Sequence, residues 1–176
     1  MNLLIVEDEV LLNEKYTEYL SHEFEVTSTF SYTEAKEALN DNFYDVILFD
    51  YNLSDGKGLD LVKEFDLEVL SQGFKPVLVL VTAYSKEKLA IESLNLGVFR
   101  YLEKPMTRED LVAQMLAAKE EARIRHGQAA LAQKFLLGEK AKKIFKNDYF
   151  VSERELEVIE ALLVHGKNKT VAEKLF

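Results

Sequence analysis

The chain has 176 residues, 48% of them hydrophobic and 30% charged, and a formal net charge of −9 at pH 7. This length suits one domain with an appendage, and the absence of cysteine excludes disulfides, thiolate metal sites and cysteine nucleophiles. The longest apolar run, Val77 to Val81, is far below the roughly 18 residues of a membrane span, which predicts a globular cytoplasmic protein with no membrane partner.

Segments typical of strands and of helices alternate along the first two thirds of the chain. The strand segments are short and rich in apolar or β-branched residues, and there are five of them: 2–7, 25–28, 45–50, 77–82 and 99–102. Each precedes a segment with helical periodicity or a capping signal: 10–20, 31–40, 58 to about 70, 85–96, and a helix that begins near Thr107. This alternation predicts an α/β fold with a five-stranded, doubly wound parallel sheet and a C-terminal α-helical extension.

The extension begins as a long helical segment. No helix breaker occurs between Leu111 and Ile124, and helical composition resumes after Gly127, which indicates an extended or broken linker helix over 123–149. The helical segment from Leu111 onward has apolar positions that suit either a dimer seam or a face packed on the parent domain: Leu111, Met115, Ala118 and Ala122.

The charge differs between the two parts of the chain. Residues 1–120 hold 11 Lys and Arg against 23 Asp and Glu, whereas residues 121–176 hold 11 against 8. An acidic body favours a divalent cation over nucleic acid, while a mildly basic tail permits contact with phosphates. We therefore expect the two parts to have different partners.

Polar residues fall at the ends of the predicted strands. In a parallel sheet these ends share one edge, where the loops carry functional groups. The predicted edge carries five such residues: Glu7, Asp8, Asp50, Thr82 and Lys104. Each alone has an ordinary structural explanation, and Asp50, for example, suits a turn or a helix cap. Their coincidence at strand ends favours a common site.

The residue types at this edge predict phosphoryl chemistry. Oxygen ligands without histidine or cysteine suit Mg²⁺. The cation and Lys104 would together neutralise a phosphoryl group, to which the Thr82 hydroxyl would donate a hydrogen bond. Asp50 would then be the nucleophile, because carboxylates can form acyl phosphates.

Residues 1 to about 120 resemble the CheY-like receiver domain of two-component response regulators, and we place this domain at 1–122. The segment from Asp50 to Leu59 matches the family's phosphoacceptor loop, except that Ser54 stands where proline is usual. The other matching motifs follow or end the first, fourth and fifth strands: Glu7-Asp8, Thr82-Ala83 and Lys104-Pro105.

The resemblance implies that a sensor histidine kinase phosphorylates Asp50. It also implies that Mg²⁺ is held by Asp8, Asp50 and the backbone carbonyl of Asn52, with Glu7 in support. Such a protein catalyses only its own phosphorylation and dephosphorylation and is not otherwise an enzyme. In the family, Asn52 and Tyr84 stand at positions that tune the lifetime of the phosphoryl group.

The resemblance further implies a conformational switch. Thr82 would move toward the phosphoryl group and Tyr101 would turn inward. This would alter the face made by the helix at 85–96, the strand at 99–102 and the helix that follows. The Lys104-Pro105 bond is commonly cis in the family, which X-Pro bonds tolerate.

Residues 150–176 resemble the start of a LuxR-type helix-turn-helix domain. The matching pieces are Val151-Ser152-x-Arg154-Glu155, Gly166, and Asn168-Lys169-x-Val171-Ala172-Glu173. In that family the helix that enters the major groove would follow Phe176, so we expect a partial domain without its recognition helix. The implied function is a phosphorylation-controlled transcriptional regulator, with DNA as a partner if the complete output domain is present. The alternative is a receiver whose output is protein contact or homodimerisation.

An enzyme of the haloacid dehalogenase type and a nucleotide-binding loop both fit less well. Haloacid dehalogenases also phosphorylate an aspartate at a strand end, but they need a second aspartate two residues on as the general acid, and Asn52 stands there. The Gly56-Lys57-Gly58 segment lacks the spacing of a glycine-rich phosphate loop. The three histidines, His22, His126 and His165, show no metal-ligand spacing and suit the surface or helix ends.

Overall fold

The computed structural model describes residues 1–64, 75–83 and 87–148, with side chains described as far as residue 130. The chain divides into two compact units, Met1–His126 and Gly127–Phe176. Three sequence predictions lie outside the described residues: the end of the helix expected to reach about residue 70, the role of Tyr84, and the helix-turn-helix at 150–176. Within the described part of the chain, no helix has both the length and the apolar character that crossing a membrane requires.

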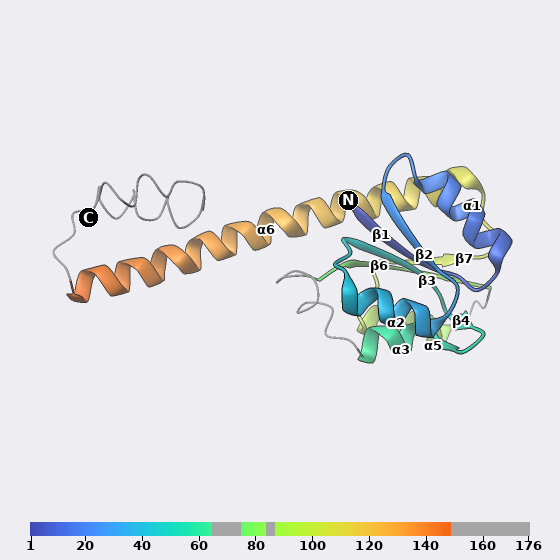
Figure 1. Cartoon of the computed structure of the whole chain (residues 1–176), viewed down its shortest axis with the longest axis horizontal. Coiled ribbons are helices and arrows are strands. Elements are labelled where there is room, and N and C mark those ends of the chain that lie inside the picture. The colour runs from blue at the N-terminus through green and yellow to red at the C-terminus, as the bar shows by residue number, and fades with distance from the viewer. Residues whose placement is uncertain (65–74, 84–86, 149–176) are drawn as a thin grey trace. The chain divides into compact units, whose positions relative to one another are not determined.

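A five-stranded parallel sheet forms the centre of the first unit (Figure 1). Its order is β2-β1-β3-β6-β7, and its strands are β1 (Asn2–Val6), β2 (Glu25–Thr29), β3 (Val46–Asp50), β6 (Val77–Thr82) and β7 (Arg100–Glu103). The three inner strands are buried almost throughout, which explains their continuous apolar sequences. The strand order changes direction between β1 and β3, and in open α/β sheets the crevice at such a point is the usual place for a site.

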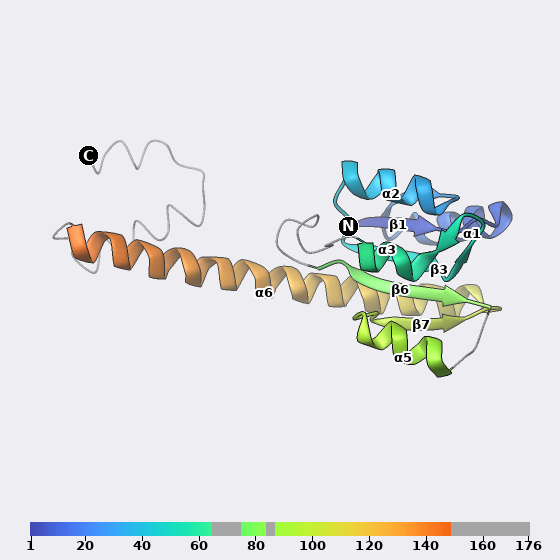
Figure 2. The same ribbon diagram turned by 90° about the horizontal axis from the view of Figure 1, so that it is seen from below.

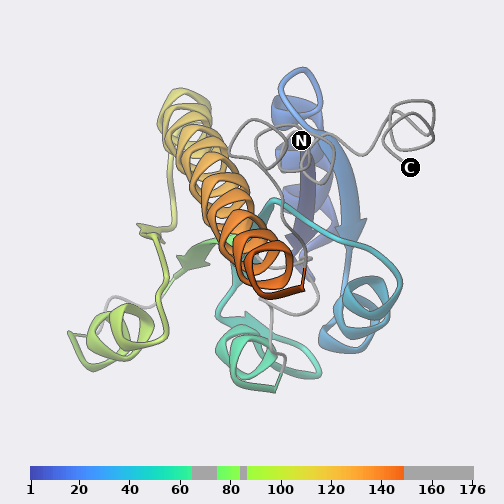
Figure 3. The same cartoon turned by 90° about the vertical axis from the view of Figure 1, so that its left-hand side faces the viewer.

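Helices cover both faces of this sheet (Figures 2 and 3). One face carries α1 (Val10–Leu20) and the beginning of α6 (Arg108–Asp148), and the other carries α2 (Tyr32–Asp41), α3 (Gly58–Glu64) and α5 (Glu87–Asn95). Strand residues alternate between two core clusters, so that Leu3 packs with α1 and α6 while Leu4 packs with α2 and α3. These observations confirm the predicted doubly wound α/β fold.

The apolar stripe on α6 packs within the first unit itself. Its four residues are at most 1% exposed and belong to the cluster that includes Leu3 and Val79: Leu111, Met115, Ala118 and Ala122. Of the two interpretations that the sequence left open, packing on the parent domain is therefore correct, and the dimer seam through these residues is not. The helix also continues past Gly127, where an added Cβ would meet nothing within 4 Å.

Polar contacts hold α6 at the amino ends of the strands. Lys119 Nζ lies 2.9 Å from Glu23 Oε2, and His126 Nε2 lies 3.0 Å from Asp45 Oδ1. Arg125 donates to the backbone oxygen of Pro76 at 3.2 Å. His126, which the sequence placed on the surface or at a helix end, is thus half-buried and paired with a carboxylate.

A small hairpin that was not predicted from the sequence follows β3. It consists of β4 (Asn52–Leu53) and β5 (Gly56–Lys57), which pair antiparallel, with Asn52 opposite Lys57. Strands of two residues have no alternating apolar pattern, so periodicity cannot reveal them. The hairpin connects β3 to α3 and borders the carboxyl end of the sheet.

Candidate functional site

The structure brings the predicted polar residues to one edge of the sheet. Asp50 is the last residue of β3, while Glu7 and Asp8 follow β1. Thr82 ends β6, and its carbonyl accepts a hydrogen bond of 2.8 Å from the backbone N–H of Lys104, which follows β7. Parallel pairing places these strand ends side by side because it fixes all five strands in the same direction.

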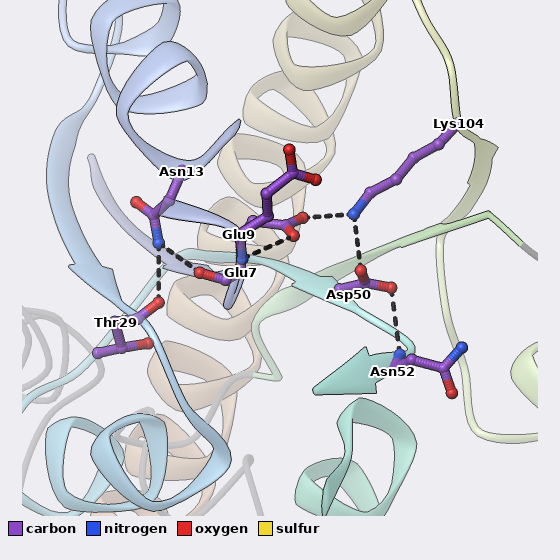
Figure 4. A network of polar contacts seen from close by, with 7 residues as sticks. All are labelled: Glu7, Glu9, Asn13, Thr29, Asp50, Asn52 and Lys104. Atoms are coloured by element: carbon purple, nitrogen blue, oxygen red, sulfur yellow. Dashed lines mark hydrogen bonds and ion pairs between the residues drawn. The ribbon is translucent and has the colours of Figure 1, made fainter. Parts of the chain in front are cut away.

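Lys104 joins two buried carboxylates at this edge (Figure 4). Its Nζ lies 2.6 Å from Asp50 Oδ2 and 2.6 Å from Glu7 Oε2. The remaining oxygens are also engaged, since Asp50 Oδ1 accepts from the Asn52 N–H at 3.2 Å and Glu7 Oε1 accepts from the Glu9 N–H at 3.4 Å. Asp50 is 8% exposed and Glu7 is 2% exposed. The Asp50 side chain therefore keeps a small exposed surface, while its contacts with Lys104 and Asn52 fix its orientation.

Burial and pairing act on the protonation of this cluster. Burial raises the pKa of Glu7, and the hydrogen bond and charge of Lys104 offset this only in part. Burial works to lower the pKa of Lys104, but its hydrogen bonds to Asp50 and Glu7 outweigh that effect and raise it. Lys104 therefore stays an ammonium, and it is the fixed cation of the site.

Three carboxyl groups share the site with this one ammonium. Carboxylate oxygens of Glu7, Asp8 and Asp50 lie within 4.8 Å of one another. With all three ionised, negative charge exceeds the charge of Lys104 by two, and crowded like charges favour a cation between them. An all-oxygen donor set of this kind fits Mg²⁺.

The two predicted switch residues lie on neighbouring strands. Thr82 is buried at the end of β6, opposite Glu103 in the β6 and β7 pairing. Tyr101 lies on β7, half-buried, and packs against the core cluster on the α2, α3 and α5 face. The Lys104-Pro105 peptide bond between β7 and α6 is cis. Movement of Thr82 or Tyr101 remains a prediction.

Asn13 supports the site but was not singled out from the sequence. Its fully buried side-chain amide donates to the backbone oxygens of Glu7 at 2.9 Å and Thr29 at 2.8 Å (Figure 4). It thereby holds the end of β1 against β2, just where the acidic loop begins. An asparagine on the helix face that also carries Tyr16 and Leu20 was the available signal, because a polar residue there needs a partner.

Asp55 fastens the loop that follows Asp50. Its carboxylate accepts from the N–H of Tyr32 at 2.7 Å, and from the N–H and hydroxyl of Thr33 at 3.0 and 2.9 Å. These groups lie at the start of α2, so Asp55 caps that helix from a distance. Asp55 belongs to the segment from Asp50 to Leu59 that matched the family's motif, but this contact could not be predicted from the sequence.

Gly58 permits the backbone to pass close to Asp50. A Cβ at this position would lie 2.0 Å from the carbonyl oxygen of Asp50 and 2.7 Å from the Phe49 ring. The Gly58 N–H donates to the Tyr51 carbonyl at 2.9 Å, which closes the loop at its end. The loop that follows Asp50 therefore requires glycine at position 58.

Comparison with known proteins settles the family. The model of the response regulator receiver domain matches residues 3–116. This chain belongs to the response regulator receiver family. Receiver domains of response regulators bind Mg²⁺ through an acidic pocket and interact with histidine kinases, and the receiver resemblance noted in the sequence is confirmed. The LuxR-like resemblance of residues 150–176 lies beyond the matched segment and stays a prediction.

Several curated relatives are transcriptional regulators. The phosphate regulon transcriptional regulatory protein PhoB of Klebsiella pneumoniae is 32% identical over 116 residues, which is 65% of this chain and 50% of PhoB. The transcriptional regulatory protein DltR of Streptococcus agalactiae is 29% identical over 133 residues, or 74% of this chain and 58% of DltR. The chain thus spans about half the length of the curated relatives it matches.

Solved structures agree on the fold. A CheY-like response regulator receiver domain protein from Methanospirillum hungatei aligns with a TM-score of 0.62 and 25% identity, covering 72% of this chain and 97% of that one. The receiver domain of a LuxO repressor protein from Vibrio parahaemolyticus aligns with a TM-score of 0.63 at 21% identity, covering 70% and 92%. Both are receiver domains, as expected for the first unit.

Proposed function

We propose that this chain acts in a two-component response regulator and that a sensor histidine kinase transfers a phosphoryl group to Asp50 in a Mg²⁺-dependent reaction. The observation that carries the proposal is the setting of the Asp50 carboxylate. It stands at the end of a central strand, held by Lys104 Nζ and the Asn52 N–H, beside two further acidic groups. A turn residue or helix cap would not need a buried lysine between two carboxylates.

The donor set supports a Mg²⁺ site at the same place. Asp8 and Asp50 would supply carboxylate oxygens, the Asn52 backbone carbonyl a third ligand, and Glu7 support from behind, where Lys104 holds it. When bound, Mg²⁺ supplies positive charge to the oxygens of the transferred phosphoryl group. No turnover beyond the protein's own phosphorylation and dephosphorylation is proposed.

The residues of the chain perform the remaining tasks. Asp50 attacks phosphorus, and the bond from phosphorus to the donor's histidine nitrogen breaks as the bond to the Asp50 carboxylate oxygen forms. The Asn52 N–H and Lys104 hold the carboxylate in one orientation, which lowers the entropic cost of reaching the reactive geometry. Lys104 supplies fixed positive charge near the new phosphoryl group, and Thr82 supplies a hydroxyl donor.

The proposed output is control of transcription. Phosphorylation adds a dianion at the carboxyl edge, and the predicted response moves Thr82 and Tyr101 and so alters the face made by α5, β7 and α6. Curated relatives of about twice the matched length are transcriptional regulators, which supports DNA as the final partner through residues beyond the receiver unit.

Protein contact is the alternative output. One observation favours it, because α5 exposes two large apolar side chains, Ile91 at 52% and Leu94 at 71%. Size-exclusion chromatography of the phosphorylated protein, with Ile91→Ser and Leu94→Ser beside the wild type, distinguishes the two. A mass increase that both variants lose would favour assembly through α5.

Phosphorylation is tested by intact mass after incubation with acetyl phosphate, with Mg²⁺ or with EDTA. We expect one added phosphoryl group that requires Mg²⁺ and is absent in Asp50→Asn. Asp41→Asn, which changes an exposed carboxylate at the end of α2, serves as the matched control and should still be phosphorylated. A gain that persists in Asp50→Asn, or no gain in any protein, would contradict the proposal.

A further inference from the structure

The hairpin beside Asp50 contains a lysine that the proposed reaction has not used. Lys57 lies on β5 directly opposite Asn52 on β4. Its Nζ donates a hydrogen bond to the side-chain oxygen Oδ1 of Asn52, and it also lies 5.0 Å from the centre of the Tyr51 ring. Lys57 thus contacts both residues that immediately follow the phosphoacceptor.

The backbone that carries Lys57 is held on both sides. Before it, Asp55 is bound to the start of α2, and Gly56 packs against the Tyr32 ring, where an added Cβ would lie 2.9 Å away. After it, the Gly58 N–H donates to the Tyr51 carbonyl at 2.9 Å. The ammonium of Lys57 therefore acts from a fixed base, although the side chain itself is exposed.

This contact determines which way the Asn52 amide faces. An ammonium has only donors, so it can hold the amide oxygen but not the amide nitrogen. The NH₂ group must then point to the other side. In Figure 4 the amide nitrogen of Asn52 is on the side where the Asp50 carboxylate lies, and the oxygen is turned away. The backbone N–H of the same residue donates to Asp50 Oδ1 at 3.2 Å, which keeps Asn52 next to the phosphoacceptor.

We propose that Lys57 is a positioning residue that prolongs the life of the phosphoryl group on Asp50 by holding the Asn52 side-chain oxygen away from water that attacks it. The inference rests on the proposed phosphorylation of Asp50. In hydrolysis, the oxygen of water bonds to phosphorus and the bond from phosphorus to the Asp50 oxygen breaks. The bonding electrons return to the carboxylate, and both protons of the water leave on dihydrogen phosphate.

An acceptor beside the phosphoryl group speeds this reaction by orienting the attacking water. The amide oxygen is the only acceptor on the Asn52 side chain, and the hydrogen bond from Lys57 fixes the direction in which it points. Release of that oxygen would allow the amide to turn and accept a hydrogen bond from water. Lys57 thus acts through Asn52 and without touching the reacting atoms.

The test measures the first-order loss of phosphoryl group from Asp50 after acetyl phosphate is removed, at saturating Mg²⁺. We expect Lys57→Met to lose it about threefold to tenfold faster than the wild type, the effect of one additional hydrogen bond to the water. Lys57→Arg should restore most of the lifetime, because a guanidinium also has only donors. Lys63→Met removes the same charge from α3, where its ammonium pairs with Asp60 and Glu92, and should match the wild type.

The Asn52→Ala background separates positioning from general electrostatics. There, Lys57→Met should leave the rate of hydrolysis unchanged, because no amide remains to be held. The inference would be overturned if Lys57→Met accelerated hydrolysis equally with Asn52 and with Asn52→Ala. It would also be overturned if, with Asn52 present, the phosphoryl lifetime of Lys57→Met equalled that of Lys63→Met. Either result would leave the proposed function intact. Failure of the wild type to accept any phosphoryl group would overturn both.

A second measurement does not depend on phosphorylation. The order parameter of the Asn52 side-chain NH₂ group, measured by ¹⁵N relaxation, should be higher in the wild type than in Lys57→Met if Lys57 holds the amide. Equal order parameters in the two proteins would show that Lys57 does not hold the amide, and the inference would fail for that reason alone.

Discussion

Carboxylates meet a cation at both ends of the sheet, and the two ends differ in burial. At the carboxyl end, Lys104 pairs with Glu7 and Asp50, whose side chains are only 3% and 11% exposed. At the amino end, Lys119 pairs with Glu23, and both side chains are about a third or more exposed. Solvent screens the second kind of pair, whereas removal of one partner from the first kind leaves charge without compensation. The same kind of contact therefore secures a helix at one end and holds the candidate site together at the other.

The largest effect is expected from Lys104→Met, which breaks the buried cluster. Glu7 and Asp50 would face each other without their shared cation, at a cost of about 3 kcal/mol in the free energy of unfolding. Urea unfolding in EDTA measures this cost. Added Mg²⁺ should stabilise the variant more than the wild type, because the cation then replaces the missing charge. A loss no larger than that of Lys119→Met would contradict the contrast between the two ends.

Gly58→Ala should have the next largest effect, again confined to the carboxyl end. The new methyl group would lie 2.0 Å from the Asp50 carbonyl oxygen, and the required backbone shift should cost about 2 kcal/mol and slow phosphorylation by acetyl phosphate. Gly127→Ala is the matched control, since nothing lies within 4 Å of its added Cβ. It should not destabilise the protein, because alanine favours a helix more than glycine does. Thermal unfolding of both variants gives the comparison.

Asp55→Asn should show an effect that depends on pH. Hydrogen bonds from Thr33 and Tyr32 lower the pKa of Asp55 below its ordinary value of 3.8. A carboxyl with a lowered folded-state pKa stabilises the protein above its unfolded-state pKa, and this stabilisation disappears as the pH falls through the folded-state value. The wild type should therefore exceed Asp55→Asn in stability at neutral pH, and the difference should shrink in acid.

Ser31→Ala provides the control for that titration. Ser31 also caps α2, with its hydroxyl oxygen accepting from the Glu34 N–H at 3.1 Å, but it carries no charge. Its substitution should cost the same at neutral and acid pH. If urea unfolding gives parallel pH profiles for Ser31→Ala and Asp55→Asn, the Asp55 carboxylate does not act as a charged cap.

The smallest effect is expected from Lys119→Met at the amino end. Loss of this exposed pair should cost about 0.5 kcal/mol, and high salt should reduce the difference from the wild type. Phosphorylation of Asp50 should be unchanged. A cost of several kcal/mol in urea unfolding would mean that burial does not distinguish the two ends.

The sequence predicted most of the fold and the place of the site, for identifiable reasons. Five apolar segments separated by helical ones imply parallel strands, and parallel strands place their carboxyl ends together. The sequence alone therefore placed Asp50 and Lys104 at one edge of the sheet. That Lys104 lies between Asp50 and Glu7 could not be predicted in this way. Side-chain contacts depend on the twist of the sheet and on side-chain rotamers, which the periodicity of the sequence does not predict.

Other features escaped prediction because their determinants are not periodic. Met115 and Ala118 belong to an apolar stripe whose sequence pattern would be the same whether the sheet or a dimer partner covered it. The pattern alone therefore could not show that the stripe packs on the sheet. The hairpin at 52–57 is too short for a pattern, and the contact between Asp55 and Thr33 spans 22 residues. Asn13 was visible only as a polar residue on an apolar face.

The short connection between β7 and α6 has a mechanical consequence. Lys104 is followed by only three residues, 105–107, before α6 begins at Arg108, and its own N–H is bonded to the Thr82 carbonyl. A hydrogen bond and a short backbone segment therefore connect the end of β6, which carries Thr82, to Lys104 and to the start of α6. Because this connection is so short, we expect any displacement of Thr82 or Lys104 to reach the first turn of α6 through the backbone itself.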